Sequence, residues 1–313
     1  MDCPVCKSNK EIIFVHPENQ APIFHSMFGA DILECTDCKF IFADFIHPET
    51  IDLFYKFFCR STLTAEEFKR LRSNAKESSR SQLKTIKSYL PKKIKRVLDY
   101  GGGIGETARL FIPIAEEVYI TEREPHAIKH IKEEPRLRLL DEANLLNDSY
   151  VSFFDLIIFS NVLEHIAYPI SAIQKFSRLL TQNGQLFIEI PNEEPFIRAT
   201  GTSMSHHISY FSENTLKKLI VREGSFDIEH MRTCGPKVED MIAAGHILYD
   251  FNSQKTPNGW VIRAVLRNAR PSLTVSSPSF SLQEAGEMLK RLSRSIFMVN
   301  CQRFYEHQNV KPK

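Results

Sequence analysis

Apolar and polar positions alternate in short runs near the start of the chain, and the pattern changes farther along. The runs IIFV (12–15), ILEC (32–35) and FIFADF (40–45) have the period of two that predicts β-strands. From residue 96 to residue 267, apolar runs of strand length alternate with stretches of helical periodicity. This alternation predicts an α/β domain whose parallel sheet carries helices on both faces.

The strands expected in this domain share a high apolar content and, in several cases, polar residues at the carboxyl end. They are RVLDY (96–100), EVYIT (117–121), LRLLDEAN (137–144), FDLIIFSNVLEHI (154–166), GQLFIEIPN (184–192) and, last, WVIRAVLR (260–267). A helix that stops at Asn183-Gly184 precedes the fifth strand. Because ligands bind beyond the carboxyl ends of the strands in open α/β sheets, the polar strand ends are candidate site residues.

Four segments follow from these patterns. We expect a metal ribbon at 1–58, with a helical pattern over 51–58, and a basic helical linker at 59–95. A nucleoside-binding domain at 96–270 includes a segment, about 193–212, that is long enough to cover the pocket. The tail at 271–313 has a helical seam that would pack on its own core or, as the alternative, form a homodimer. The seam residues are Leu282, Ala285, Leu289, Leu292, Ile296 and Val299.

Four of the seven cysteines form two C-x2-C pairs, Cys3 with Cys6 and Cys35 with Cys38. This spacing lets two thiolates from one tight turn reach the same ion, and two such turns complete the tetrahedral shell that structural zinc prefers. A shell of four thiolates has no open position, so this Zn²⁺ is expected to stabilise the fold and to perform no chemistry.

The glycine-rich run that follows the strand at 96–100 predicts a nucleoside-binding turn. Gly101, Gly103 and Gly105 lie between this strand and a helix that begins near Glu106, so a ligand can approach the backbone at the helix N-terminus. Gly103, Gly105 and Ala108 also match the G-x-G-x-x-A pattern of NAD-binding domains.

Other acidic and polar residues favour S-adenosylmethionine over NAD. Asp99, two positions before Gly101, can brace the turn and face an ammonium group, whereas it would repel a pyrophosphate. Glu122 follows the second strand, where an acid can accept hydrogen bonds from both ribose hydroxyls. At the ends of the third and fourth strands, we expect Asp141 and Glu142 to hold a base edge and Asn161 to line the pocket.

Composition restricts the class of protein. The chain has 313 residues, 42% hydrophobic and 25% charged, and a net charge of +2, which is typical of a globular protein without a demand for nucleic acid. It contains neither a long apolar run nor a pattern typical of a signal peptide, so we expect a cytoplasmic protein without a membrane partner. Eleven Lys and Arg residues occur between Lys69 and Arg96 against one acid, Glu77. This stretch indicates a solvated helix and linker or, as the alternative, a surface for a phosphate-bearing or acidic partner.

The motifs together resemble the class I methyltransferases, specifically a small bacterial group that begins with a four-cysteine zinc ribbon. The resemblance covers about residues 1–235 and rests on the runs CPVC, CTDCKFIF, VLDYGGGIGETA, FDLIIFSNVLEHI and HHISYFSENTLKKLIVREGSF. It implies a Rossmann-like fold and S-adenosylmethionine as cofactor, and a similarity to sugar and natural-product methyltransferases that act on carbon or oxygen.

Methyl transfer needs alignment of donor and acceptor, and a hydroxyl acceptor must also lose its proton. His165 and His207 are the candidate general bases, and Tyr210 lies three positions after His207. The leading hypothesis is a small-molecule acceptor, such as a nucleotide-linked sugar or a biosynthetic intermediate. The alternatives are an RNA methyltransferase and a non-catalytic module that retains the nucleoside pocket.

Overall fold

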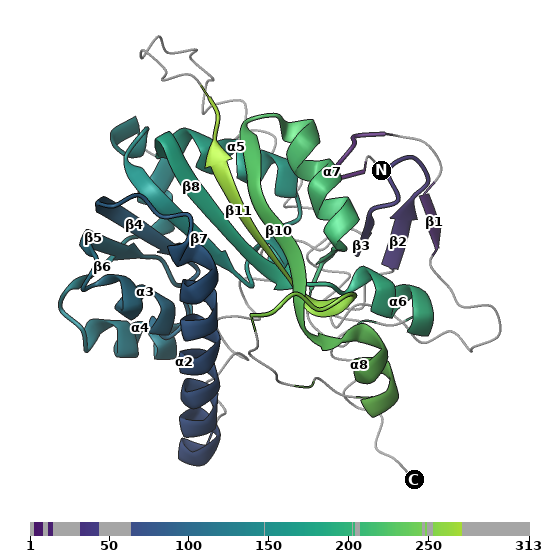
Figure 1. The fold of residues 1–313 in the computed structure, drawn as a ribbon, viewed down its shortest axis with the longest axis horizontal. Helices are drawn as coiled ribbons and strands as arrows, with labels where there is room; N and C mark the ends of the chain where they lie inside the picture. The colour runs from purple at the N-terminus through teal and green to yellow at the C-terminus, as the bar shows by residue number, and fades with distance from the viewer. Residues whose placement is uncertain are drawn as a thin grey trace, which may run out of the picture. The chain divides into compact units, whose positions relative to one another are not determined.

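A seven-stranded sheet forms the centre of the computed structural model (Figure 1). In spatial order its strands are β10 (Phe226–Lys237), β11 (Gly259–Asn268), β8 (Leu180–Pro191), β7 (Phe154–Ser160), β4 (Ile94–Tyr100), β5 (Ala115–Ile120) and β6 (Leu137–Leu139). The five strands from β8 to β6 are parallel, whereas β11 runs antiparallel to both β8 and β10. The predicted α/β class is confirmed, and the sheet gains an antiparallel edge.

Helices cover both faces of this sheet. Successive strand residues point to opposite faces, so each strand contributes side chains to both helical layers. One layer contains α2 (Ala65–Lys87), α3 (Glu106–Phe111) and α4 (Pro125–Lys132), and the other contains α5 (Pro169–Leu179) and α7 (Glu213–Glu223). In β7, Ile158 packs with the first layer and Ile157 with the second. The central strands are therefore apolar on both faces, as expected for a covered parallel sheet.

The strand order places a cleft at one edge of the sheet. From β4 the chain adds β5 and β6 on one side, and it later adds β7 and β8 on the other. The connections after β4 and β7 therefore diverge, and an open α/β sheet binds its ligand at this switch point.

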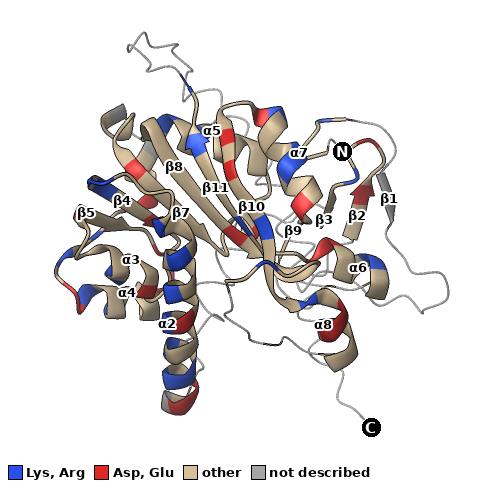
Figure 2. Ribbon diagram, in the orientation of Figure 1, with Lys and Arg blue, Asp and Glu red and all other residues tan. Residues whose placement is uncertain are grey.

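Helix α2 occupies residues 65–87 of the segment that the sequence predicts as a basic linker. Thr64 and Glu67 form a capping box at its start. Its inward face is polar and buried, and the face consists of Ser79, Ser81, Gln82 and Thr85 followed by Ile86. Most of its Lys and Arg side chains are exposed, and they form the blue bands along α2 in Figure 2. The helix is thus solvated on one face and packed through hydrogen bonds on the other.

The N-terminal residues form a separate four-stranded sheet. It consists of β1 (Ile12–Phe14), β2 (Ile32–Cys35), β3 (Ile41–Ala43) and β9 (Ser209–Tyr210), all paired antiparallel. The strands expected at 12–15, 32–35 and 40–45 are present over the described residues 12–14, 32–35 and 41–43. The fourth strand, β9, comes from the distant segment at 193–212, and its pairing with β3 attaches the N-terminal sheet to the cleft.

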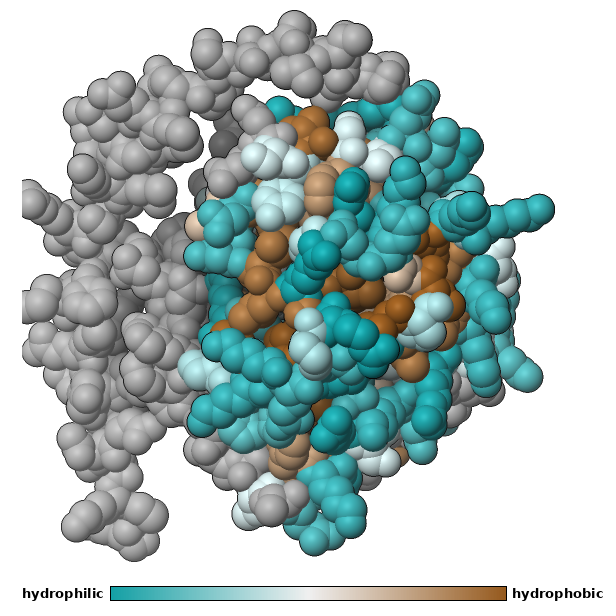
Figure 3. All heavy atoms as spheres, turned by 90° about the vertical axis from the view of Figure 1, so that its left-hand side faces the viewer, coloured by the Kyte–Doolittle hydropathy of each residue, from teal (hydrophilic) through white to brown (hydrophobic). Residues whose placement is uncertain are grey.

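The described residues are 3–8, 12–14, 32–43, 64–146, 148–201, 203, 207–245, 248 and 253–270. The helical pattern at 51–58 and the seam from Leu282 to Val299 lie outside them. The shorter elements are α6 (Glu194–Thr200), α8 (Val238–Ala244), η1 (Glu142–Leu146), η2 (Asp148–Tyr150) and η3 (Leu163–His165). On the face shown in Figure 3, hydrophilic side chains dominate and hydrophobic ones gather near the middle. Within the described part of the chain, each helix is too short or too polar to cross a membrane.

One helix boundary differs from the prediction. Helix α5 ends at Leu179, before the expected stop at Asn183-Gly184, and β8 begins at Leu180. The Asn268 side chain of β11 donates hydrogen bonds to the carbonyls of Ser177 and Leu180 at 3.1 and 3.3 Å. A distant strand thus satisfies carbonyls at the helix end, a contact that local sequence does not reveal.

A buried ion pair between β11 and β8 gives a test of this packing. Arg263 Nε donates to Glu189 Oε2 at 2.5 Å, and both side chains are about 95% or more buried. Arg263→Met should lower the free energy of unfolding by about 3–5 kcal/mol, because it leaves a buried carboxylate without its cation. Urea denaturation followed by circular dichroism measures the change.

Arg267→Met in the same strand is the matched control. Arg267 is 43% exposed and pairs with Asp227 at 2.8 Å, so its loss should cost less than about 1 kcal/mol. Equal unfolding midpoints for the two variants would contradict the importance of the buried pair.

Candidate active site

The turn after β4 adopts a backbone conformation that glycine favours. Gly101, Gly103 and Gly105 have φ angles of +66°, +57° and +81°, in the left-handed region. A Cβ atom on Gly102 would lie 2.7 Å from Asp99 Oδ2, so a side chain there would collide with the carboxylate. The backbone N–H groups of Gly101 and Gly102 donate to the hydroxyl and carbonyl oxygens of Thr121, each at 3.0 Å.

The Asp99 carboxylate lies fully buried beneath this turn. Its Oδ2 accepts a hydrogen bond from the Ala108 N–H of α3 at 3.0 Å, and its Oδ1 has no partner among the described residues. Burial raises the pKa of Asp99 to about 7, the Ala108 N–H lowers it, and the nearby charge of Glu122 raises it further. One oxygen thus braces the turn, and the other is available to a cation in the cleft.

The acidic residues after β5 and β6 lie along the same cleft. Glu122 Oε1 accepts hydrogen bonds from the backbone N–H groups of Arg123 and Glu124 at 2.7 and 2.9 Å. Glu142 is held by the guanidinium of Arg123 and by the Tyr100 hydroxyl, which both donate to its carboxylate. Asp141 is exposed and accepts from the Ala143 N–H at 3.0 Å, which caps η1.

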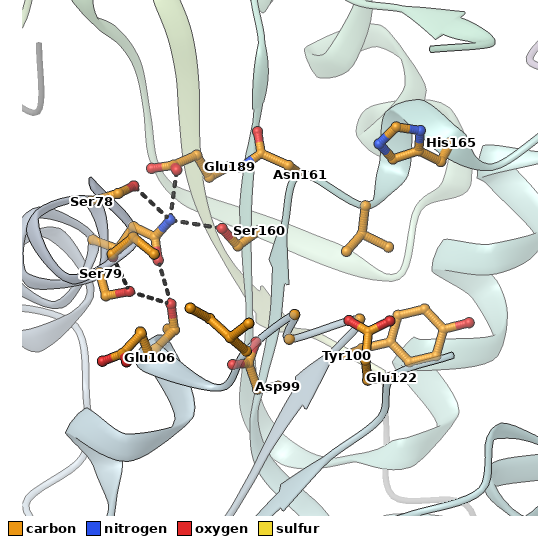
Figure 4. Close-up of a pocket in the computed structure, with 18 of the residues that line it drawn as sticks. Ser78, Ser79, Asp99, Tyr100, Glu106, Glu122, Ser160, Asn161, His165 and Glu189 are labelled. Atoms are coloured by element: carbon orange, nitrogen blue, oxygen red, sulfur yellow. Dashed lines mark hydrogen bonds between the residues drawn. The ribbon is translucent and has the colours of Figure 1, made fainter. Parts of the chain in front are cut away.

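A cleft of about 1180 Å³ brings these residues together. Of the residues predicted from sequence, those that line it are Asp99, Gly101, Gly103, Glu122, Asp141, Glu142, Asn161, His165 and His207. Gly105, the N-cap of α3, and Tyr210 are not among the lining residues. Figure 4 shows His165 on the far side of the cleft from Ser78 and Ser79 of α2, with Asn161 between them, beside Ser160.

Two histidines and two buried glutamates form a cluster at one end of this cleft. The rings of His165 and His207 meet edge to face, with centroids 4.8 Å apart. His207 Nδ1 donates to Glu193 Oε2 at 2.6 Å, and His207 Nε2 lies 3.9 Å from Glu164 Oε1. Burial alone would lower the pKa of His207, but the charges of Glu193 and Glu164 raise it above its ordinary value. Burial raises the pKa of Glu164 to about 7, against the opposing effect of His207.

Tyr210 lies beside this cluster in β9. Its hydroxyl donates to the His207 carbonyl at 2.8 Å, and its ring packs among buried residues of the N-terminal sheet. The Ile208 N–H donates to the Glu164 carbonyl at 3.0 Å. The structure therefore places Tyr210 where it orients the His207 backbone.

The polar wall opposite the histidines was not predicted from the sequence. Gln82 Nε2 donates to Ser160 Oγ at 2.7 Å and to Glu189 Oε1 at 2.6 Å, and Arg263 pairs with the other Glu189 oxygen. Figure 4 shows Ser160 and Glu189 on this wall. The sequence contained a signal for this wall: LFIEIP has a single acid and WVIRAVL has a single base, each in an otherwise apolar strand.

The four cysteines of the two C-x2-C pairs come together in the N-terminal sheet. Cys3 and Cys38 have their sulfurs 3.6 Å apart, Cys6 and Cys35 have theirs 3.5 Å apart, and all four sulfurs lie within 4.8 Å of one another. Each pair is followed by a lysine with positive φ, and the lysine N–H donates to the carbonyl of the first cysteine. The two turns are thus equivalent knuckles.

A Rossmann-like sheet, a glycine turn over a buried acid, and acidic residues after the next strands define a class I S-adenosylmethionine-dependent methyltransferase. A family model described as a methyltransferase domain matches residues 65–230, more than half of the chain. The chain therefore belongs to this family of methyltransferase domains and is an enzyme of that class. The family match begins at the first residue of α2, so this helix belongs to the matched domain.

Solved structures share this fold. A SAM-dependent methyltransferase from Thermotoga maritima, described as a possible histamine N-methyltransferase, is 14% identical, with a TM-score of 0.50; the match covers 70% of this chain and 99% of that chain. A SAM-dependent methyltransferase from Archaeoglobus fulgidus is 16% identical, with a TM-score of 0.46 and coverages of 62% and 94%. At such identities the likeness concerns the fold alone. A search of curated proteins gave no match.

The raised pKa of Asp99 predicts pH-dependent cofactor binding. Binding of an S-adenosylmethionine ammonium group at Asp99, as the sequence predicts, would require an ionised carboxylate, and its pKa of about 7 means that it is protonated at lower pH. Affinity should therefore weaken by up to about tenfold for each pH unit below 7 and level off above it. Titration calorimetry between pH 5.5 and 8 measures this slope.

Asp99→Asn keeps the shape of the side chain but removes its titration. This variant should bind S-adenosylmethionine weakly at every pH, without the slope. A slope that persists in the variant would assign the pH dependence to another group.

Proposed function

We propose that the protein transfers the methyl group of S-adenosylmethionine to an oxygen or carbon atom of a small molecule bound in the same cleft. One juxtaposition carries this proposal: the glycine turn with its buried Asp99 and the two histidines, His165 and His207, line a single cavity. Donor binding and acceptor activation would therefore occur side by side.

Residues at the strand ends are suited to hold the cofactor. Asp99 Oδ1, which has no hydrogen-bond partner among the described residues, would face its ammonium group, and Glu122 would accept hydrogen bonds from the ribose hydroxyls. Asp141 and Glu142 would border the base, and Asn161 would contact the cofactor from the end of β7. The cofactor supplies a methyl group on a positively charged sulfur, so these residues mainly bind, orient and exclude water.

The size and polarity of the cleft support a small, polar acceptor. Its volume of about 1180 Å³ exceeds the roughly 300–1,000 Å³ typical of a site for one ligand, so it has room for a second molecule. Beside the turn, Gln82, Ser160 and Glu189 form a hydrogen-bonding wall. These groups suit a hydroxyl-rich acceptor such as a nucleotide-linked sugar or a biosynthetic intermediate.

The histidines are proposed to control the acceptor proton. His207 is held by Glu193 through Nδ1, and its ring contacts that of His165. Tyr210 acts as a positioning residue, since its hydroxyl binds the His207 carbonyl. The N-terminal sheet contributes indirectly, because β3 pairs with the strand that carries Tyr210.

The four-cysteine cluster is proposed to hold a structural Zn²⁺. Its short sulfur–sulfur distances, 3.5 and 3.6 Å, approach the value of about 3.8 Å expected for four thiolates around zinc at about 2.3 Å. Arg222 of α7 donates to the Cys6 carbonyl at 3.0 Å, so the cluster would also brace α7 against the N-terminal sheet.

The exposed basic face of α2 supports an RNA acceptor as a second candidate. Lys69, Lys76, Arg80 and Lys84 are exposed on this helix, which also lines the cleft. RNA retention that falls steeply with salt would favour this candidate. Absence of both RNA and cofactor from the purified protein, as judged by mass spectrometry, would favour a module without catalytic activity.

Glu122→Ala tests the cofactor site. Loss of two charge-assisted hydrogen bonds should weaken S-adenosylmethionine binding by at least about tenfold in titration calorimetry. Glu116→Ala is the control, because Glu116 lies exposed in the preceding strand β5 and should leave the affinity unchanged. Equal affinities of the Glu122 variant and the wild type would refute the ribose assignment. Radiolabelled methyl transfer to nucleotide sugars and cell extracts then identifies the acceptor.

Cys35→Ser tests the zinc site. The variant should lose most of its zinc by atomic absorption and unfold at a lower temperature, because the ribbon is too small to fold without its ion. Cys234→Ala removes a buried cysteine of β10, outside the cluster, and should retain zinc. Undiminished zinc in Cys35→Ser would rule out the four-thiolate shell.

A further inference from the structure

Three side chains at the end of the cleft bring potential metal ligands together. Glu164, His165 and His207 each offer one ligand atom, and these atoms lie within 4.8 Å of one another. Glu164 and His165 come from η3 after β7, and His207 comes from the segment that leads into β9. This cluster is separate from the four cysteines and differs from them in ligand chemistry.

Glu164 is the unusual member of the cluster. Its side chain is 2% exposed, and neither carboxylate oxygen accepts a hydrogen bond from any described residue. A buried carboxylate without partners is costly, and nearly all buried polar groups in proteins are satisfied. His207 Nε2 lies 3.9 Å from Glu164 Oε1, beyond hydrogen-bond distance. A cation between these two atoms would satisfy the carboxylate.

The second nitrogen of His207 is held as in a metal-ligating histidine. Nδ1 donates to Glu193 Oε2 at 2.6 Å, and the other Glu193 oxygen accepts from Ser203 Oγ at 2.6 Å. A carboxylate on one imidazole nitrogen fixes the tautomer and directs the lone pair of the other nitrogen, an arrangement that is common around metal sites. Here that directed atom is Nε2, on the Glu164 side.

We propose that Glu164, His165 and His207 bind a divalent first-row transition-metal ion whose remaining coordination positions face the methyl acceptor. Two imidazoles and one carboxylate are a typical ligand set for catalytic sites, which keep an open position. Bonds of about 2.1 Å in a tetrahedral site hold ligand atoms about 3.4 Å apart. The 3.9 Å separation of Glu164 and His207 therefore needs only a small side-chain contraction.

This inference rests on the proposed methyltransferase function and specifies how the histidines act. As ligands they would not take up the proton themselves. An acceptor hydroxyl at the open position would have a lowered pKa and would release its proton to water, leaving an oxygen lone pair. That lone pair would form the bond to the methyl carbon as the carbon–sulfur bond breaks, with its electron pair passing to sulfur.

Cobalt(II) titration of the full-length protein, loaded beforehand with one Zn²⁺ per chain to fill the four-cysteine site, tests the second site. Co²⁺ bound by nitrogen and oxygen ligands gives visible bands without the intense near-ultraviolet absorption of thiolate ligands, so the two sites are distinguishable. We expect one added Co²⁺ per chain without the thiolate signal. Glu164→Gln and His165→Gln should each weaken its binding by at least about tenfold.

Glu133→Gln is the matched control. Glu133 contacts a histidine, His130, at 3.1 Å on the surface of α4, so this change should leave Co²⁺ binding unaltered. Because Glu164 is buried, Glu164→Gln could fail to fold; the partly exposed His165 then decides the outcome. Absence of non-thiolate Co²⁺ binding in the wild type, or wild-type affinity in His165→Gln, would overturn the proposal.

Calorimetry of S-adenosylmethionine on the same samples separates the two hypotheses. Cofactor binding without Co²⁺ binding would refute the metal site and leave the methyltransferase function intact. Absence of S-adenosylmethionine binding to the wild type would instead refute the proposed methyltransferase function.

Discussion

The cleft depends on the ion pair and the hydrogen bonds of the buried Glu189 carboxylate. One oxygen accepts from Gln82 of α2, and the other accepts from Arg263 of β11. The Glu189 carbonyl also accepts from the Asn161 N–H at 2.8 Å, which fixes the turn after β7. A single residue in β8 thus links a helix that precedes the sheet, the last described strand and the loop that leads to His165. Because the Glu189–Arg263 pair is buried, loss of either charge would leave the other buried and unpaired. The hydrogen bond from Gln82 to Glu189 holds α2 over the edge of the sheet where ligands bind.

The N-terminal sheet has a similar organising effect on the other end of the cleft. Its strand β3 pairs with β9, in the register Ile41 with Tyr210 and Phe42 with Ser209. His207 lies just before this strand, so the backbone that carries it is fixed by hydrogen bonds from two directions, from Tyr210 and from Ile208 to Glu164. The four-cysteine cluster, although distant in sequence, is therefore connected to the candidate catalytic histidines through the pairing of β3 with β9. This connection would give the proposed structural metal site a physical role in an enzyme whose main sheet already has a substantial core.

Local sequence patterns predicted the helices and strands whose type depends on residues close together in the sequence. The strand before Gly101, the helix from Glu106 and the strand at 154–160 follow from apolar runs and glycine conformational preferences, and the structure contains all three. Helix α2 was predicted as a helix but interpreted as a solvated linker. Most of its buried face consists of Ser, Gln and Thr, which periodicity of apolar residues does not detect. Strand β10 was not predicted, since its partly exposed residues lack a clear alternation.

The sequence by itself determined the class of fold, the glycine turn with Asp99, the acids after the next strands and the paired cysteines, because each depends on spacing along a few residues. Only the tertiary structure decided that Glu164 is buried without a hydrogen bond from any described residue to its carboxylate, that Glu193 holds His207, and that Glu189 meets Arg263. Those facts depend on which distant segments meet and on whether water reaches them. The desolvation that shapes the chemistry of a buried carboxylate is a property of the packed molecule, and residue spacing along the chain carries no measure of it.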